Sequence, residues 1–347
     1  MRKILYILHR YPQMSETYME TEIRALRGRF EIEILTTGKP DLSYEWHHPY
    51  TALAGTGEII QAAMRARPDV IHGHYTQMIP LIAQAARRAG VPFTLRTHSF
   101  DVFGPAQEKL PAYREEVNGE HCAGILGFPP TLELFARAGW DMRKIVSCFP
   151  IIEYDWFYDR SPNGDAIMNV GACIPKKKMD DFVQLGRSMP DKTFNLYALG
   201  YYKGRIEKLN AEMGNPVRVI PPVQPRAMPA EYKKHQWLVY TGNTGLPTVG
   251  WPLAVAEAQA SGVGVCMCRV RPDLEEYLGG AGHLFDTIEE AASIIRNPVP
   301  DEMREAGFAQ AAKSDIHAHV DRLVDLWRRA YSRDTGSGGA ARSPGSG

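Results

Sequence analysis

The stretch PTVGWPLAVAEAQASGVGVCMC, from Pro247 to Cys268, contains the signals for a loop, a helix, a stop and a strand. Pro252 suits the first turn of a helix and Gly262 suits its end. The segment VGVCMC that follows is apolar throughout, which is typical of a parallel strand covered on both faces. Along the expected helix, Glu257 recurs with small apolar residues on one face. An unpaired carboxylate there is costly, so Glu257 calls for a partner or a ligand.

The same alternation of strand and helix runs through most of the 347 residues. Such alternation predicts parallel βαβ units, and its division into two series predicts two doubly wound α/β domains. The first series of apolar runs is KILYILH, FEIEILTT, DVIHGHY, FTLRTHS, GILGF and KIVSCFP. The second begins near Ala166 and comprises AIMNVGAC, TFNLYALG, VRVIPPV, QWLVYTG and GVGVCMC.

Composition shifts divide the chain into four parts. The segment EYDWFYDRSPNGDA is typical of a linker packed against two domains, which puts the boundary near Ser161. We therefore expect an N-terminal domain over 1–160 and a C-terminal domain over 161–315. An amphipathic closing helix over 316–332 should pack toward the N-terminal domain. The tail over 333–347 is rich in Gly and Ser and is expected to be disordered.

The charge balance and the cysteines exclude several classes of function. Forty basic residues balance forty acidic ones, so no global field attracts nucleic acid, and any phosphate site must be local. The five cysteines form no CxxC pair and no metal-ligand cluster, and we expect them to be reduced and mostly buried. Nowhere do eighteen apolar residues follow one another. We expect a cytoplasmic protein. The sequence leaves open whether it also makes peripheral contact with the inner face of the membrane.

Ligands of open parallel sheets bind beyond the carboxyl ends of the strands. With two sheets facing each other, the residues that follow the strands should line a central cleft. These residues are 9–17, 72–75, 98–101, 171–178, 200–203 and 242–252.

Four segments, in the same order along the chain, resemble motifs of retaining glycosyltransferases of the GT-B fold, family 4, in its bacterial polysaccharide-type branch. They are YPQMSETYMETEI, TLRTHSFDVF, NVGACIPKKKMDDFV and VGWPLAVAEAQASGVGV. The resemblance implies two Rossmann-like domains facing a central cleft. It also implies metal-independent sugar transfer, with no cofactor, from a nucleotide diphosphate sugar to a glycan, lipid-linked or small-molecule acceptor.

The resemblance assigns donor-side roles to five residues. Glu257 stands where the family's second Glu of Glu-x7-Glu receives the ribose hydroxyls, and Lys177 stands where a lysine neutralises the diphosphate. Gly171 belongs to the same loop as Lys177, while Pro252 and Leu253 open a helix whose free N–H groups suit a diphosphate. Two alternatives stay open: Glu257 is exposed or paired with a core arginine, and PKKK is a solvated basic turn in which either neighbouring lysine could take the role of Lys177.

His98 and Asp101 are the expected catalytic residues. His98 matches the family histidine whose backbone and ring lie against the donor sugar, and a neutral imidazole can donate a hydrogen bond to a sugar hydroxyl. The alternative is a histidine that only caps a strand end. Asp101 either holds His98 in one tautomer or serves the acceptor.

The acceptor side is expected to contain Ser15, Glu16, Thr17 and His74. Ser15 could cap the helix that follows. In HGHY, we expect His72 and His74 on opposite faces, with one touching the acceptor and the other packed in the core. They could ligate a metal only if a third ligand joined them, and the sequence shows none, so no metal site is expected.

Two departures from the family pattern affect the expected function. Ala172 replaces the arginine that normally accompanies Lys177, and Val249 replaces the first Glu of Glu-x7-Glu. Either the donor is unusual, or another cation such as Lys203, Arg205 or Arg269 substitutes, or activity is lost. The last case would leave a non-catalytic sugar-nucleotide-binding homologue or scaffold subunit. A GT-B epimerase or phosphorylase is a third reading.

Overall fold

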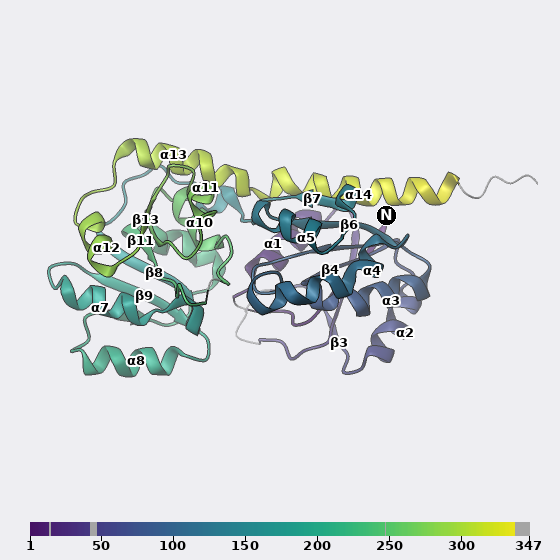
Figure 1. Ribbon diagram of the computed structural model, residues 1–347, viewed down its shortest axis with the longest axis horizontal. Coiled ribbons are helices and arrows are strands. Elements are labelled where there is room, and N and C mark those ends of the chain that lie inside the picture. Colours follow the sequence, from purple (N-terminus) through teal and green to yellow (C-terminus); the bar gives the residue numbers. More distant parts are fainter. Residues whose placement is uncertain (14, 42–46, 247, 337–347) are drawn as a thin grey trace, which may run out of the picture.

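The computed structural model describes residues 1–13, 15–41, 47–246 and 248–336, which form two parallel sheets side by side (Figure 1). The first sheet has seven strands in the order β3-β2-β1-β4-β5-β6-β7 and the second has six in the order β10-β9-β8-β11-β12-β13. The strands of the first sheet are β1 (Lys3–Leu8), β2 (Glu31–Thr36), β3 (Thr51–Ala52), β4 (Val70–His74), β5 (Phe93–Arg96), β6 (Cys122–Gly127) and β7 (Ile145–Ser147). Those of the second are β8 (Ala166–Ala172), β9 (Phe194–Leu199), β10 (Arg218–Ile220), β11 (His235–Tyr240), β12 (Gly264–Cys268) and β13 (His283–Phe285).

Helices connect most of the successive strands of each sheet, as the alternation in the sequence predicts. Those of the first domain are α1 (Thr17–Leu26), α2 (Thr56–Ala66), α3 (Ile79–Ala89), α4 (Arg114–Asn118) and α5 (Leu132–Arg137). Further along lie α6 (Tyr154–Phe157), α7 (Asp180–Ser188), α8 (Lys203–Glu212), α9 (Met228–Tyr232), α10 (Leu253–Ala260), α11 (Leu274–Leu278), α12 (Ile288–Ile295), α13 (Asp301–Ala311) and α14 (Ile316–Gly336). The prediction of two doubly wound α/β domains is confirmed.

The strand order reverses at one place in each sheet, and these two places position the site. In the first sheet β1 lies between β2 and β4, and in the second β8 lies between β9 and β11. Loops leave such a switch point in opposite directions and open a crevice beyond the strand ends. The segments that follow β1, β4, β8 and β11 therefore border the space between the domains.

The core of each sheet consists of the apolar runs that mark its strands. In β1 the five residues from Ile4 to Leu8 are fully buried, and all of β12 is buried as well. A strand buried on both faces needs apolar residues in succession rather than in alternation. The five cysteines are free and buried, as expected from their spacing.

The long helix α14 crosses from the C-terminal domain along the N-terminal one (Figure 1). Its buried stripe includes Leu323 and Trp327, and Trp327 donates its indole N–H to Thr94 Oγ1 of β5 at 2.9 Å. The Trp327 ring also meets the edge of Phe30 at 5.3 Å between centroids. The helix continues to Gly336, so the expected disordered tail begins too early at 333, because residues 333–336 extend an already anchored helix. The rest of the expected tail lies outside the described residues.

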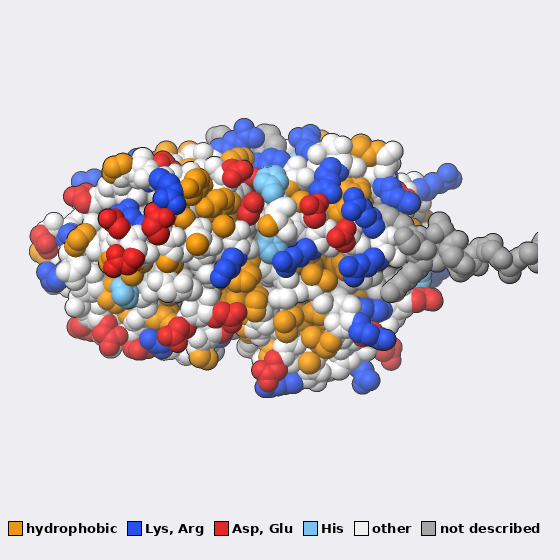
Figure 2. All heavy atoms as spheres, turned by 90° about the horizontal axis from the view of Figure 1, so that it is seen from above, with side chains coloured by type: hydrophobic (Ala, Val, Ile, Leu, Met, Phe, Trp, Pro, Cys, Tyr) orange, Lys and Arg blue, Asp and Glu red, His pale blue; other side chains and the backbone are white. Residues whose placement is uncertain are grey.

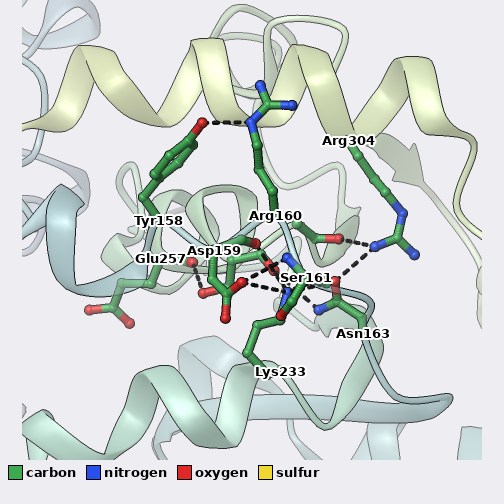
Figure 3. Close-up of polar contacts among 10 residues, drawn as sticks. Tyr158, Asp159, Arg160, Ser161, Asn163, Lys233, Glu257 and Arg304 are labelled. Atoms are coloured by element: carbon green, nitrogen blue, oxygen red, sulfur yellow. Dashed lines mark hydrogen bonds and ion pairs between the residues drawn. The ribbon is translucent and has the colours of Figure 1, made fainter.

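A lysine ties the segment between the two sheets to the C-terminal domain (Figure 3). Lys233 Nζ donates to the main-chain oxygens of Asp159, Ser161 and Ser261 at 3.0, 2.6 and 3.2 Å, and it lies 3.2 Å from Asn163 Oδ1. Arg304 reinforces this contact by donating to the same Asn163 oxygen at 2.8 Å. The carbonyl groups of an irregular segment are thereby satisfied without secondary structure.

The charge on the surface is unevenly distributed although the total is neutral. On the face that carries α13 and α14, basic side chains gather over the N-terminal half and acidic ones toward the far end of the C-terminal domain (Figure 2). Within the described part of the chain, no helix combines the length and the apolar character needed to cross a bilayer.

Candidate functional site

A cleft of about 880 Å³ lies between the two domains and is lined by both. This volume is in the range of sites that enclose a small ligand. Of the residues expected at the site, nine line it: Ser15, Glu16, Thr17, His98, Gly171, Lys177, Pro252, Leu253 and Glu257. His74 and Asp101 do not line it and lie buried beneath its floor.

Glu257 is half-buried on α10 with one oxygen bonded and the other open. Tyr232 donates its hydroxyl to Glu257 Oε2 at 2.7 Å. Among the described residues Oε1 has no hydrogen-bond partner, and the residue faces the cleft. Burial raises the pKa of Glu257 to about 7, while the Tyr232 hydrogen bond and the charge of Lys177 oppose that rise. Neither alternative from the sequence holds, since Glu257 is not fully exposed and no arginine of the described residues pairs with it.

Tyr232 was missed by the sequence analysis. It ends α9, is fully buried, and reaches Glu257 from 25 residues away in the chain. A tyrosine at the end of a short helix gives no signal of its own, so only the fold identifies this partner.

The first turn of α10 borders the cleft, because Pro252, Leu253 and Ala254 all line it. The first N–H groups of a helix have no partner within the helix. Pro252 is the N-cap in an extended conformation, and no side chain caps the turn. Tyr277 donates its hydroxyl to the Pro252 carbonyl at 2.7 Å, which holds this end of the helix in place. A helix N-terminus of this kind attracts anions through its free N–H groups and its dipole.

Lys177 approaches the same region from the end of β8. Its ammonium group lies against the backbone of Gly171, where a side chain would collide with it, and Gly171 has φ +132°. The backbone conformation favours glycine, and any side chain at this position would displace the Lys177 ammonium group. Burial lowers the pKa of Lys177 to about 8, with Lys176 contributing in the same direction. The ammonium group also lies 5.2 Å from the centre of the Tyr240 ring.

The structure separates the three lysines of PKKK. Lys178 is exposed and pairs with Asp181 at 3.0 Å, so it acts as a surface residue. Lys176 lines the cleft beside Lys177 and donates to the Thr248 carbonyl at 3.2 Å. Burial lowers its pKa to about 8 as well. Lys176 and Lys177 together supply two cations at one wall of the cleft.

Asp101 holds the main chain of the loop that carries His98 and does not contact the His98 ring. Its Oδ1 accepts the main-chain N–H of His98 at 2.8 Å, and its Oδ2 accepts that of Thr76 at 2.8 Å. Burial raises the pKa of Asp101 to about 6, although these hydrogen bonds lower it. Because both oxygens are directed at the main chain, Asp101 neither sets the tautomer of His98 nor reaches the cleft.

Aromatic rings surround His98. The Tyr18 ring lies 4.2 Å from the imidazole between centroids and the Tyr75 ring 4.7 Å. The two tyrosine hydroxyls are in hydrogen-bond contact with each other. Tyr75 adopts φ +76°, which is rare for a bulky residue and turns its ring toward His98 at the end of β4. Beside them, burial raises the pKa of Glu16 to about 7, and Tyr75 opposes the rise through a hydrogen bond.

A buried charged cluster lies beneath His98. Glu22 of α1 accepts two hydrogen bonds. Arg96 Nε donates to Oε2 at 2.7 Å, and the Tyr6 hydroxyl donates to Oε1 at 3.1 Å. The same Oε1 lies 3.0 Å from His72 Nε2 and 3.3 Å from His74 Nε2. All of these side chains are buried. Arg96 and its neighbours hold the pKa of Glu22 well below its usual value in spite of burial.

Three expectations about the N-terminal domain are wrong. His72 and His74 lie on one face of β4, because residues two apart in a strand point the same way. His74 is buried and does not reach an acceptor. Ser15 does not cap α1, which begins at Thr17 with Glu16 as its N-cap residue and no side-chain cap. The third group near the two histidines is Glu22, which the sequence analysis overlooked.

The departures from the family pattern have structural counterparts. Val249 is 2% exposed, and its carbonyl accepts a hydrogen bond from Arg271 Nη1 at 2.5 Å. Its apolar side chain offers a ligand no hydrogen bond. Of the proposed substitute cations, Lys203 lines the cleft, whereas Arg205 lines a separate small hollow. Arg269 pairs with Asp286 at 3.4 Å outside both. Lys176 and Lys203 are therefore the cations of the cleft that could replace the arginine lost at Ala172.

Comparison with solved structures finds the same fold at low sequence identity. The chain is similar to Anabaena HepE in complex with UDP-glucose, with a TM-score of 0.71 and 16% identity over 97% of this chain and 100% of that one. It is similar to sucrose-phosphate synthase from Thermosynechococcus elongatus, with a TM-score of 0.74 and 15% identity over 96% and 100%. The lipopolysaccharide outer core galactosyltransferase WaaB has a TM-score of 0.63 and 12% identity over 93% and 98%.

The sequence itself matches no family model and no curated protein. The structural neighbours are nucleotide-sugar-using glycosyltransferases of the GT-B fold.

Proposed function

We propose that this chain is a retaining glycosyltransferase of the family 4 type that transfers a sugar from a nucleotide diphosphate sugar. The observation that carries the proposal is the donor wall of the cleft. There Glu257 with its open Oε1, Lys177, and the N-terminus of α10 face one space. These three features match two parts of a nucleoside diphosphate: Glu257 suits the ribose hydroxyls, and Lys177 with the N-terminus of α10 suits the charged diphosphate.

Each part of the ligand would meet a group of suitable chemistry. Ribose hydroxyls would donate to Glu257, and a charged acceptor makes such hydrogen bonds stronger than neutral ones. The diphosphate would lie between the first turn of α10 and the two lysines, Lys176 and Lys177. These cations supply the charge that a metal ion supplies elsewhere, which supports metal-independent transfer. The UDP-glucose bound by HepE makes a uridine donor the first to test.

The reaction that follows from this placement is substitution within an ion pair, with retention at the anomeric carbon. The acceptor hydroxyl would attack on the face from which the nucleoside diphosphate leaves, and the leaving phosphate would take its proton. The protein would contribute positioning of the reactants and stabilisation of charge on the leaving diphosphate. A glycan, a lipid-linked sugar or a small molecule would enter from the side of Glu16, Thr17 and His98, as expected for bacterial polysaccharide biosynthesis.

A non-catalytic binding subunit is the second candidate, and Val249 favours it. Its side chain offers no hydrogen bond where a carboxylate would meet the donor sugar. The two candidates agree on nucleotide binding and differ on turnover.

The test begins with a thermal-shift series of nucleoside diphosphates and their sugars, followed by hydrolysis of the best donor without acceptor. A ligand at 100 times its Kd adds about 2.7 kcal/mol of stability. We expect stabilisation by UDP or another nucleoside diphosphate and slow release of the free sugar in its retained anomeric form. Stabilisation without any release would favour the binding subunit. No stabilisation by any member of the series would contradict both candidates.

A further inference from the structure

Below the cleft, a chain of polar contacts leads from the buried carboxylate of Glu22 to the ring of His98. Glu22 Oε1 lies 3.3 Å from His74 Nε2, and His74 Nδ1 lies 3.0 Å from His98 Nε2. The residues come from α1, from β4 and from the loop after β5, so the fold and not the sequence brings them together. Three groups in a row, each with a nitrogen or oxygen within 3.3 Å of the next, restrict where the protons can be.

The proton positions follow from the carboxylate. Glu22 is ionised and can only accept, since Arg96 donates to Oε2 at 2.7 Å and Tyr6 donates to Oε1 at 3.1 Å. A nitrogen lone pair 3.3 Å from this charge would be repelled, so His74 Nε2 carries its proton. Burial lowers the pKa of His74 to about 4, so the ring is neutral and its Nδ1 is an acceptor.

The second ring follows from the first. Because His74 Nδ1 accepts, His98 Nε2 must be the donor across their 3.0 Å contact. Burial keeps the pKa of His98 well below its usual value, so this ring is neutral as well. Its remaining nitrogen, Nδ1, has no hydrogen-bond partner among the described residues, and His98 lines the cleft.

We propose that Glu22, acting through His74, holds His98 in the tautomer with the proton on Nε2, so that Nδ1 meets the ligand as a hydrogen-bond acceptor. His98 therefore receives a hydrogen bond from a ligand hydroxyl and does not donate one, contrary to the expectation from the sequence. Glu22 and His74 are positioning residues, because neither touches the cleft. The identification of that hydroxyl with a donor sugar rests on the proposed function, whereas the tautomer does not.

His72 supports the same assignment from the other side of the carboxylate. Its Nε2 lies 3.0 Å from Glu22 Oε1, and its Nδ1 lies 2.7 Å from Thr94 Oγ1. Trp327 already donates to that Thr94 oxygen at 2.9 Å, which leaves the hydroxyl proton of Thr94 for His72 Nδ1. His72 thus carries its proton on Nε2, 3.0 Å from the carboxylate, as His74 does at 3.3 Å.

A metal ion held by Glu22, His72 and His74 is the competing reading of this cluster, since their ligand atoms lie within 4.8 Å of one another. The Arg96 guanidinium on the same carboxylate opposes a second cation there. The two readings predict opposite tautomers. A metal on His74 Nε2 would put the proton of His74 on Nδ1, so His98 would accept at Nε2 and carry its own proton on Nδ1.

The test is a long-range ¹⁵N–¹H correlation spectrum of the full chain with ¹⁵N-labelled histidine at neutral pH. The signals of His98 are assigned by their loss in His98→Gln. We expect Nε2 of His98 to have the chemical shift of a protonated nitrogen and Nδ1 that of an unprotonated one. A protonated Nδ1 would overturn the proposal, and if it disappeared on treatment with a chelator it would establish the metal reading.

Glu22→Gln tests the origin of the preference, with Glu20→Gln as its matched control. Glu20 is also buried on α1 and contacts Tyr11 and His48, which lie outside the path to His98. We expect mixed tautomers of His98 in Glu22→Gln and the wild-type pattern in Glu20→Gln. An unchanged His98 in a folded Glu22→Gln would overturn the role of Glu22. If Glu22→Gln does not fold, the wild-type spectrum still decides the tautomer.

A titration with UDP-glucose and with UDP separates this inference from the proposed function. We expect the Nδ1 signal of His98 to move with UDP-glucose and to change less with UDP. The sugar release of Glu22→Gln should fall about tenfold in kcat, as for one lost hydrogen bond in the transition state, while its KM changes little. Absence of binding by both probes would count against the uridine donor and leave the tautomer result standing. Binding with a protonated Nδ1 would contradict the tautomer alone.

Discussion

Glu257 is the residue on which the donor assignment depends. Its Oε2 is bonded to Tyr232 and its Oε1 faces the cleft, so a ligand can complete the carboxylate without displacing a protein partner. The sequence indicated this residue because its carboxylate lies on a helix face that is otherwise apolar. It could not indicate Tyr232, which contributes from a separate helix.

Glu257→Gln should separate binding from stability. Replacing the charge weakens two hydrogen bonds from ribose, so affinity for UDP should fall by about 1.5 kcal/mol or more, roughly tenfold. Calorimetric titration measures this. The matched control is Glu231→Gln, which also removes a carboxylate that accepts a tyrosine hydroxyl, from Tyr197 at 2.7 Å, but lies outside the cleft. Equal affinity in wild type and Glu257→Gln would refute the ribose contact.

The same variant has a defined pH dependence. Burial raises the pKa of Glu257 from 4.5 to about 7, so between these values the folded protein binds more protons than the unfolded one. Ionised Glu257 therefore reduces stability increasingly as the pH rises through this window. The melting temperature of Glu257→Gln relative to that of wild type should therefore rise between about pH 5 and about pH 8. A variant that loses stability over that range would show that the carboxylate has a structural partner.

Lys177 should be distinguishable from its exposed neighbour. Lys177→Met removes a cation from the cleft and should weaken UDP binding about tenfold or more, whereas Lys178→Met should leave it unchanged. The pKa of Lys177 is lowered to about 8 in the folded protein, so its charge costs stability below that pH and the cost disappears toward 10.5. We therefore expect Lys177→Met to melt at or above the wild-type temperature at pH 7. Equal loss of affinity in both variants would mean that only the total charge matters.

Glu22 shows why part of the N-terminal site escaped prediction. It lies on α1 among buried apolar residues, the same signal that drew attention to Glu257. Its partners Tyr6, His72 and Arg96 belong to three different strands, and their convergence depends on the order of strands in the sheet. Sequence spacing gives the faces of each element, and only the assembled sheet gives the distances between them.

At the scale of elements, the apolar runs identified the strands well and the connecting segments less well. Runs such as VGVCMC become buried central strands because all of their residues are apolar or small and are stabilised by burial on both faces. The two-residue β3 was not expected, because its pairing with β2 and not its composition makes it a strand. The turns at the carboxyl ends of the strands depend on contacts from distant elements, as the main-chain bonds of Asp101 show.

The segment between the sheets offers a test of how it is held. Lys233→Met removes four hydrogen bonds and leaves at least the carbonyls of Asp159 and Ser161 without that donor. We expect a loss of about 1–3 kcal/mol in the free energy of unfolding, measured by urea denaturation. Lys234→Met is the control, since Lys234 is exposed and pairs with Glu231 at 2.7 Å. Equal stability of both variants would show that packing alone holds the segment.

The closing helix offers a second test at this scale. Trp327 is fully buried, meets Phe30 and donates to Thr94, so Trp327→Ala should cost about 3–5 kcal/mol of stability. Arg329→Ala, on the exposed side of α14, should cost less than about 0.5 kcal/mol. Thermal or chemical unfolding of the two variants measures the difference. A small effect of Trp327→Ala would mean that α14 contributes little to the N-terminal domain.

At the scale of the whole molecule, two sheets with one switch point each bring separate halves of the site together. The donor wall comes from the ends of β8 and β11 with α10, and the opposite wall from the ends of β1, β4 and β5. Contacts across the cleft already exist, since Arg271 stacks 3.8 Å from the centre of the Phe103 ring and Trp251 lies 5.0 Å from Phe149. The overall plan was predictable from the alternation of elements, whereas these cross-domain contacts were not.

The central claim is that a nucleoside diphosphate occupies the cleft with its ribose on Glu257. The measurement that tests it most directly is a crystal structure of the chain with UDP, or with the nucleoside diphosphate that raises the melting temperature most. The account predicts ribose oxygens at about 2.6–3.2 Å from Glu257 and the diphosphate against the first turn of α10 beside Lys177. A nucleotide bound elsewhere, or in the cleft with its ribose turned away from Glu257, would contradict it.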